Sequence, residues 1–402
     1  MGVEKFGVFS FVQVFVSFFF PLISLGMDTV LVKELITNNK RIDLFLSNAF
    51  YLKLSSSVIS IIFIFLILHY LGDQEGKSFL ISILAFKLFF DCFLVIDFYF
   101  QSISKSKLFV ISRTIALSIG IFLKIYFILN GFDIYFFVSA LLIESVLLSA
   151  LLVIFFLFEK KDFKFTYFSK HTSKSLLKKS WPMLFSSFVI LIYMKIDQIM
   201  LNYLANDYEL GIYSFAVKLS ESIYFIPAII CVSFFPAIAK LRSLDNQKYI
   251  KSVQTLFDSM FLTALILIFL IIFFFESFLL FLGLEQYQNS LSILYIHIWA
   301  GIMVFFGIAR HRYIVLENLQ KFEILLDMFA GILNVFLNLL FIPKYGAQGA
   351  AFATLISYFG GSILPMIFIR KFRHIFLMFI ISLLSPFKYF YRIVYVWNRR
   401  NS

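Results

Sequence analysis

Long apolar stretches separated by short polar connections form the pattern along the chain. They occupy residues 7–25, 43–71, 79–100, 108–129, 133–158, 181–204, 211–238, 253–282, 289–309, 322–343, 347–369 and 374–391. An apolar helix of about 20 residues crosses a hydrocarbon core about 30 Å thick and satisfies its own backbone hydrogen bonds there. The alternating pattern of a barrel strand is missing. The chain therefore reads as an all-α polytopic membrane protein of about 11–12 transmembrane helices.

Composition supports the same class. The 402 residues are 61% hydrophobic and only 14% charged, whereas soluble domains are about 25% charged. A soluble globular enzyme is thereby excluded. Cys92 and Cys231 lie in apolar stretches and indicate no disulfide or Cys-ligated metal. The histidines do not cluster at ligand spacing and no GxxxxGK[ST] motif occurs, so we expect no metal and no nucleotide cofactor.

Basic residues distinguish the two sides of the membrane. One set of alternate loops carries 22 Lys and Arg residues, and the opposite set carries only Lys5, Lys77 and Lys344. The positive-inside rule places the first set in the cytoplasm and the N-terminus outside. The net charge of +12 then faces anionic lipid headgroups, and no nucleic acid is needed to explain it.

The longest hydrophilic connection divides the chain. We predict an N-terminal bundle of five spans at 1–158, a basic cytoplasmic linker at 159–180, a C-terminal bundle of six spans at 181–370, and a basic C-terminal segment at 371–402. If 374–391 crossed the membrane, Arg392, Arg399 and Arg400 would lie outside, so an interfacial helix is favoured over a span.

The two halves share a short motif. Gly7-Val8-Phe9-Ser10-Phe11 aligns with Gly211-Ile212-Tyr213-Ser214-Phe215, which indicates a repeated bundle, although coincidence in a Phe-rich chain stays open. A whole apolar stretch, 181–204, precedes the second copy, whereas six residues precede Gly7. We therefore expect a first bundle without its first helix, and a gene start about 30 codons upstream that encodes one more span.

Charged residues inside or at the edges of spans are candidates for function, because such groups usually face a bundle interior or a wet cavity. Arg113 and Lys124 are about 20° apart around one helix and about 16 Å apart along it. Ala116 and Gly120 between them would leave room for a bulky headgroup. Snorkelling of both cations to the two interfaces is the alternative. The cations that we expect to line a path through the membrane are Lys53, Lys87, Arg113, Lys124, Lys195 and Lys218.

Two of these cations have a carboxylate nearby on the same helix. Lys87 and Asp91 are at i, i+4, and Lys218 and Glu221 are at i, i+3. Structural neutralisation and competition by a substrate phosphate or a proton stay open for both pairs. Asp197 has no local cation on its own face, so it is a candidate for ion coupling, with an interhelical hydrogen bond as the alternative.

One region resembles the Wzx-type O-antigen flippases. Lys195-Ile196-Asp197-Gln198-Ile199-Met200-Leu201 and the following Glu209 to Glu221 are similar to the family's D-Q-I-M-L … G-x-Y-S-x-A-x-K-x-S-E pattern. Supporting stretches are 7–11 with 31–35, 99–101 and 342–351, so that the resemblance extends from residue 2 to about 370.

The resemblance implies two pseudo-repeated bundles of the MATE-like type, with the first helix of the N-terminal bundle absent here. It also implies a flippase, not an enzyme, that moves undecaprenyl-diphosphate-linked O-antigen or capsule repeat units across the bacterial inner membrane by alternating access. The implied partners are the lipid-linked oligosaccharide, membrane lipids, a polysaccharide polymerase and a chain-length regulator, in lipopolysaccharide biosynthesis.

Two other functions stay open. A MATE-like extruder of small cations would favour acidic groups in its path, whereas basic groups are in surplus in the first half of this chain. A membrane O-antigen polymerase would need a sizeable hydrophilic loop outside. The longest outer connections, 72–78 and 205–210, are only a few residues long, which disfavours the polymerase.

Overall fold

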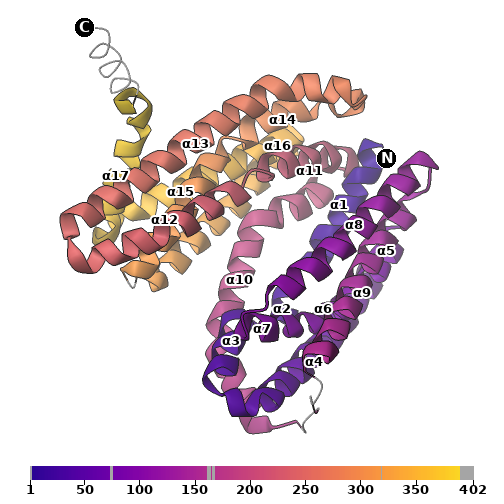
Figure 1. Cartoon of the computed structure of the whole chain (residues 1–402). Helices are drawn as coiled ribbons and strands as arrows, with labels where there is room; N and C mark the ends of the chain where they lie inside the picture. Colours follow the sequence, from indigo (N-terminus) through magenta and orange to yellow (C-terminus); the bar gives the residue numbers. More distant parts are fainter. Residues whose placement is uncertain (1, 73–75, 161–163, 165–167, 318, 390–402) are drawn as a thin grey trace. The chain divides into compact units, whose positions relative to one another are not determined.

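The computed structural model describes residues 2–72, 76–160, 164, 168–317 and 319–389, and its regular elements in these ranges are helices (Figure 1). Ten helical stretches of the described chain are long and apolar enough to cross a membrane. The last, Leu325–Phe368, changes direction at Gly346, where φ is 55° and ψ is −132°. It is therefore two helices, which gives the eleven spans expected from the sequence and confirms the all-α polytopic class.

Residues 8–192 form one compact unit, called unit 1 here. Its helices are α1 (Val3–Ser17, from residue 8 on), α2 (Phe20–Ser24), α3 (Asp28–Thr37), α4 (Ile42–Leu71), α5 (Lys77–Ala85), α6 (Lys87–Asp91), α7 (Val95–Ser102), α8 (Lys107–Leu129), α9 (Ile134–Glu159) and the first part of α10 (Lys170–Leu204).

Two features of unit 1 can be traced to particular residues. The first span breaks at Leu25 and Gly26, both with positive φ, between α2 and α3. A Cβ on Gly26 would lie 2.3 Å from the backbone nitrogen of Leu184, so only glycine lets α10 pass here. Beyond the break, Leu31 and Leu35 lie one turn apart on α3 and are buried in an apolar core with residues of α4, α7 and α9.

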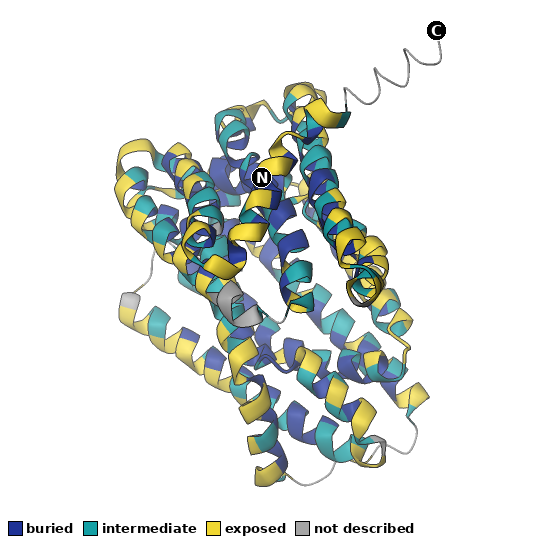
Figure 2. Cartoon of the chain, turned by 90° about the vertical axis from the view of Figure 1, so that its left-hand side faces the viewer, coloured by how far each residue is buried: buried dark blue, intermediate teal, exposed yellow. Residues whose placement is uncertain are grey.

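Other helix faces of unit 1 are apolar and exposed. On α4, Ile59, Ile62, Phe63 and Leu66 are all more than half exposed and follow the i, i+3, i+4, i+7 spacing of one helix face. Figure 2 shows such exposed residues beside buried ones along individual helices. An exposed stripe of this kind suits contact with lipid chains, because burial in protein is not needed to remove it from water.

Residues 2–7 and 193–402 form the second compact unit, unit 2. Its further helices are α11 (Asp207–Glu221), α12 (Phe225–Leu244), α13 (Asn246–Phe281), α14 (Ser290–His297), α15 (Ala300–Leu316), α16 (Gln320–Phe368) and α17 (Arg373–Leu383). The boundary between the units lies inside α10. At the start of α13, the Asp245 carboxylate accepts hydrogen bonds from the backbone N–H groups of Lys248 and Gln247. These bonds, the first above all, lower the pKa of Asp245.

The two motif glycines meet inside unit 2. A Cβ on Gly7 would lie 1.9 Å from the carbonyl oxygen of Asp207, and a Cβ on Gly211 would lie 2.2 Å from that of Val3. Each glycine thus faces the residue four positions before the other, so the starts of α1 and α11 cross with near two-fold symmetry. Such backbone approach between membrane helices requires small residues. The contact supports the alignment of the two motifs as a repeat.

The described part of the C-terminal segment packs along α13. The Gln254 side chain donates to the Met378 carbonyl at 3.0 Å, and the Lys388 ammonium lies 3.0 Å from the buried Asp258 carboxylate. Arg392, Arg399 and Arg400 lie outside the described residues, and the interfacial placement of this segment stays a prediction.

Candidate functional site

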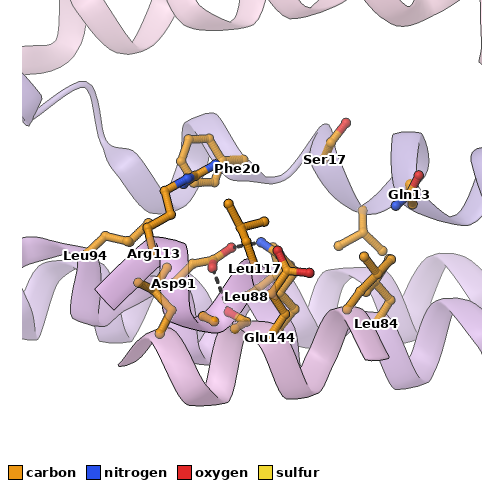
Figure 3. A pocket seen from close by; sticks show the side chains of 16 residues that line it. Gln13, Ser17, Phe20, Leu84, Leu88, Asp91, Leu94, Arg113, Leu117 and Glu144 are labelled. Atoms are coloured by element: carbon orange, nitrogen blue, oxygen red, sulfur yellow. Dashed lines mark hydrogen bonds and ion pairs between the residues drawn. The ribbon is translucent and has the colours of Figure 1, made fainter. Parts of the chain in front are cut away.

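A cavity of about 400 Å³ lies in unit 1 among α1, α5, α6, α8 and α9 (Figure 3). Its size suits a small ligand or the headgroup of a larger one. Leucine side chains such as Leu84, Leu88 and Leu117 make up much of its wall. The polar and charged lining residues are Gln13, Ser17, Lys87, Asp91, Arg113, Glu144 and Ser145.

Lys87 and Asp91 form an ion pair within α6. The Lys87 ammonium lies 2.6 Å from Asp91 Oδ2, and Ser145 on α9 donates a hydrogen bond to Asp91 Oδ1 at 3.0 Å (Figure 3). The Asp91 side chain is 5% exposed and that of Lys87 is 36% exposed. Asp91 is therefore fixed from two helices, which is how a buried carboxylate is usually satisfied. The i, i+4 pairing expected from the sequence is confirmed, while its function stays a prediction.

Arg113 on α8 is the cavity-lining cation that forms no ion pair with the described residues. Its side chain is exposed and directed into the cavity (Figure 3). No carboxylate in the described part of the chain lies within 4.0 Å of its guanidinium. Lys87 is paired with Asp91, so Arg113 is the lining cation that has no ion pair within 4.0 Å, although Asp97, outside the lining, interacts with it electrostatically at longer range.

Lys124 lies further along the same face of α8 but does not line the cavity. Its ammonium lies 3.3 Å from Glu144 Oε2, which reaches over from α9. The same oxygen would lie 2.8 Å from a Cβ on Gly120. The expectation that Gly120 leaves space for a headgroup is therefore wrong for this structure, because the Glu144 carboxylate occupies that space.

The remaining predicted cations lie elsewhere. Lys53 on α4 is 2% exposed, and its ammonium lies 4.5 Å from the centre of the Phe98 ring. Lys195 and Lys218 belong to unit 2, where Lys218 lies over the Phe6 ring at 4.6 Å. The six cations thus do not form one cluster: Lys87 and Arg113 share the cavity, and Lys124 adjoins it.

Glu221 pairs with a cation on another helix. Its carboxylate accepts hydrogen bonds from the Lys195 ammonium at 2.8 and 3.1 Å. Both side chains are about one-quarter exposed. The pair joins α10 to α11 across 26 positions of sequence, a separation that local spacing does not reveal.

Asp197 lies at the centre of a buried polar network in unit 2. Its Oδ2 accepts hydrogen bonds from the Tyr213 hydroxyl and, at 3.3 Å, from the Thr354 hydroxyl. Asn334 donates to the hydroxyls of Thr354 and Ser357. The carboxylate is 3% exposed. The interhelical hydrogen bond considered for Asp197 is therefore present, and the network links α10, α11 and both halves of α16.

Sequence reasoning gave Glu144 no role in this site. It is the one carboxylate that joins the cavity wall to Lys124. The available signal was a glutamate in the middle of the apolar stretch 133–158. The preceding stretch, 108–129, has a glycine and a lysine one helical turn apart. Such a carboxylate needs a partner at membrane depth.

Comparison with solved structures supports the fold described above. The inward-facing form of a multidrug resistance MATE family transporter of the MOP superfamily has a TM-score of 0.74, with 16% identity, over 91% of this chain and 90% of that chain. The lipid II flippase MurJ in an inward closed conformation has a TM-score of 0.71, with 18% identity, over 96% of this chain and 85% of that chain. At these identities the likeness concerns the fold alone.

Sequence comparison gives the family. An uncharacterised membrane protein of Methanocaldococcus jannaschii, MJ1375, is 26% identical over 208 residues, which are 49% of this chain and 48% of the relative. The chain thus matches about half the length of that curated relative. The model of a family described as polysaccharide biosynthesis protein matches residues 1–242. This match covers more than half of the chain, which therefore belongs to the polysaccharide biosynthesis protein family and is a multi-pass membrane protein with the fold of MATE transporters and MurJ.

Proposed function

We propose that this protein is a flippase that translocates undecaprenyl-diphosphate-linked O-antigen or capsule repeat units across the bacterial inner membrane by alternating access. The observation that carries the proposal is the cavity of unit 1 with its unpaired Arg113. Membership of a polysaccharide biosynthesis family supports a saccharide cargo. The fold shared with a lipid II flippase supports movement of a lipid-linked one.

The chemistry of the cavity suits a diphosphate. A guanidinium presents a planar fork of N–H donors that can bind two phosphate oxygens at once, and such charge-assisted bonds are about twice as strong as neutral ones. Lys87, about one-third exposed, is a second donor once a phosphate competes with Asp91 for it. A charged headgroup crossing the membrane needs such groups at depth, because hydrocarbon offers none.

Ion coupling is assigned to the Asp197 network in this proposal. The Asp197 carboxylate oxygens and the hydroxyl oxygens of Tyr213 and Thr354 are ligands that a hard cation takes, and the carboxylate can equally exchange a proton. Asp91 and Glu221 have cation partners already, so we give them charge pairing. We propose that Lys195 and Lys53 contribute to the cationic path indirectly, because Lys195 is bonded to Glu221 and Lys53 lies over the Phe98 ring. A polysaccharide polymerase and its chain-length regulator would use the exported units.

Complementation tests the proposal. The reading frame is expressed in a strain that lacks its O-antigen flippase, and surface polysaccharide is scored together with the amount of protein in the membrane. We expect export with the parent chain and loss of export with Arg113→Ala at equal protein level. Full export by Arg113→Ala would remove the cavity from the substrate path.

A MATE-like small-molecule extruder is the second candidate, supported by the TM-score of 0.74. A cationic substrate would have to break the pairs of Asp91 or Glu144 before it found a free carboxylate in the cavity. Under this function, Arg113→Ala would leave drug resistance intact or increase it. Measuring drug susceptibility beside surface polysaccharide in the same strains separates the two functions.

A further inference from the structure

One face of α8 carries two cations on either side of the point where this helix stops lining the cavity. Arg113, Ala116 and Leu117 line the cavity. Gly120, on the next turn, is buried, and Lys124 follows one turn later. Arg113 and Lys124 are about 16 Å apart along the helix axis. This distance exceeds the reach of one phosphate group, so an anion that uses both cations must contact them in succession.

Glu144 fills the gap between them. Its side chain is part of the cavity wall (Figure 3), and its Oε2 lies over Gly120 and holds the Lys124 ammonium at 3.3 Å. Along α8 the cavity lining therefore ends beside a carboxylate, with a cation directly behind it, while Leu141, Leu84 and Gln13 continue the wall on α9, α5 and α1. If the carboxylate moved away, the lining would extend along α8 from Arg113 to Lys124.

We propose that Glu144 is an anionic gate: an incoming phosphate must displace it from Lys124 to pass along the cationic face of α8. This assignment rests on the proposed flippase function and adds a positioning and specificity-determining residue to the same cavity. While Glu144 holds Lys124, Arg113 is the cation available to the anion. After displacement, Lys124 becomes the second anion site and Glu144 must be accommodated elsewhere in the cavity.

The surroundings of Glu144 allow such a movement. The side chains of Lys124 and Glu144 are 29% and 22% exposed, so protein does not enclose the pair, and a doubly charged anion attracts the Lys124 ammonium more strongly than the singly charged carboxylate does. The charged groups that line the same cavity are Lys87 and Asp91 on α6 and Arg113 on α8. The Lys87 ammonium has three N–H donors, of which Asp91 accepts one, so a displaced carboxylate can share Lys87 with Asp91.

Probe binding tests the gate directly. The full chain is placed in nanodiscs of zwitterionic lipid, and the affinity for farnesyl diphosphate is measured, with uncharged farnesol as the control ligand. We expect Glu144→Gln to bind farnesyl diphosphate about fivefold more tightly than the parent, which corresponds to about 1 kcal/mol, and to leave farnesol binding unchanged. The same affinity in Glu144→Gln and the parent would overturn the gate.

Gly120→Ala tests the same idea from the opposite helix. The new methyl group pushes against Glu144 Oε2, the free end of a flexible side chain, and so weakens its hold on Lys124. We expect tighter farnesyl diphosphate binding again, even if Glu144→Gln does not fold. Gly307→Ala is the matched control, because nothing lies within 4 Å of that Cβ position, and its affinity should equal that of the parent.

The outcomes also separate the gate from the flippase proposal. Loss of binding in Arg113→Ala together with unchanged binding in Glu144→Gln and Gly120→Ala would refute the gate and leave the anion site in place. Equal binding by the parent and Arg113→Ala would refute the anion site itself. A purely structural role of the pair in joining α8 to α9 predicts lower thermal stability of Glu144→Gln without any change in the affinity of folded protein.

Discussion

The crossing of α1 and α11 at Gly7 and Gly211 gives a prediction that does not depend on substrate. In Gly7→Ala the new Cβ would lie 1.9 Å from the Asp207 carbonyl oxygen, whereas ordinary contact begins at 3.4 Å. The two helix backbones must therefore separate locally by up to about 1.5 Å, because a backbone carbonyl cannot rotate away as a side chain can. Overpacking of this kind costs about 1–3 kcal/mol, and contacts along the crossing are lost in addition.

Thermal unfolding of the purified protein in detergent measures this cost. We expect Gly7→Ala and Gly211→Ala each to lower the melting temperature, and the double variant to lose less than the sum, because the first methyl already opens the crossing for the second. Gly307→Ala in α15 is the control: its Cβ meets nothing within 4 Å, and alanine is favoured over glycine in a helix by about 1 kcal/mol. A Gly7→Ala variant as stable as Gly307→Ala would refute the tight crossing, and full additivity would refute the shared contact.

Three further predictions concern transport and topology. Arg113→Ala should lower export of surface polysaccharide about tenfold or more at equal protein level, since a hydrogen bond to a charged group contributes about 1.5–3 kcal/mol. Lys124→Ala should also lose export, and Lys124→Arg should keep part of it. Export by Lys124→Ala equal to the parent's would assign the cationic path to other residues. Asp197→Asn should abolish the dependence of export on the ion gradient, and unchanged export and gradient dependence would remove Asp197 from coupling. A cysteine at Lys170 should resist an impermeant thiol reagent in whole cells while one at Asn206 reacts, and the reverse pattern would invert the orientation.

The spans were predictable from sequence because they depend on local composition. Each of the eleven long apolar stretches from 7–25 to 347–369 corresponds to a helix or half of a broken one. The break at Gly26 was not predicted. Glycine is required at this position by the backbone of α10, about 160 positions away, which lies 2.3 Å from where a Cβ would stand, and the local sequence does not show that contact.

Among the ion pairs, too, one was predictable from local sequence and others were not. The Lys87–Asp91 pair follows from i, i+4 spacing on one helix and is present. The partners of Glu221 and Lys124 are Lys195 and Glu144, on other helices. At membrane depth a charge needs a partner wherever the fold supplies one, so tertiary packing, and not spacing along the chain, decided these two pairs.

The pairing pattern in unit 1 bears on which ligand the cavity favours. Asp91 is held by Lys87 and Ser145, and Glu144 is held by Lys124 from outside the cavity lining. Neither carboxylate is free, so an entering cation would have to break an existing pair and leave a lysine uncompensated. An entering anion meets Arg113 first, which has no ion pair to break, and at Lys124 it would replace the Glu144 carboxylate as counter-ion. Removing one partner of a buried ion pair costs more free energy than adding a counter-ion to an unpaired charge. The arrangement therefore favours anionic headgroups over cationic drugs. If so, Arg113→Ala should lower polysaccharide export, whereas under a drug-extruder function it would leave drug resistance intact or increase it.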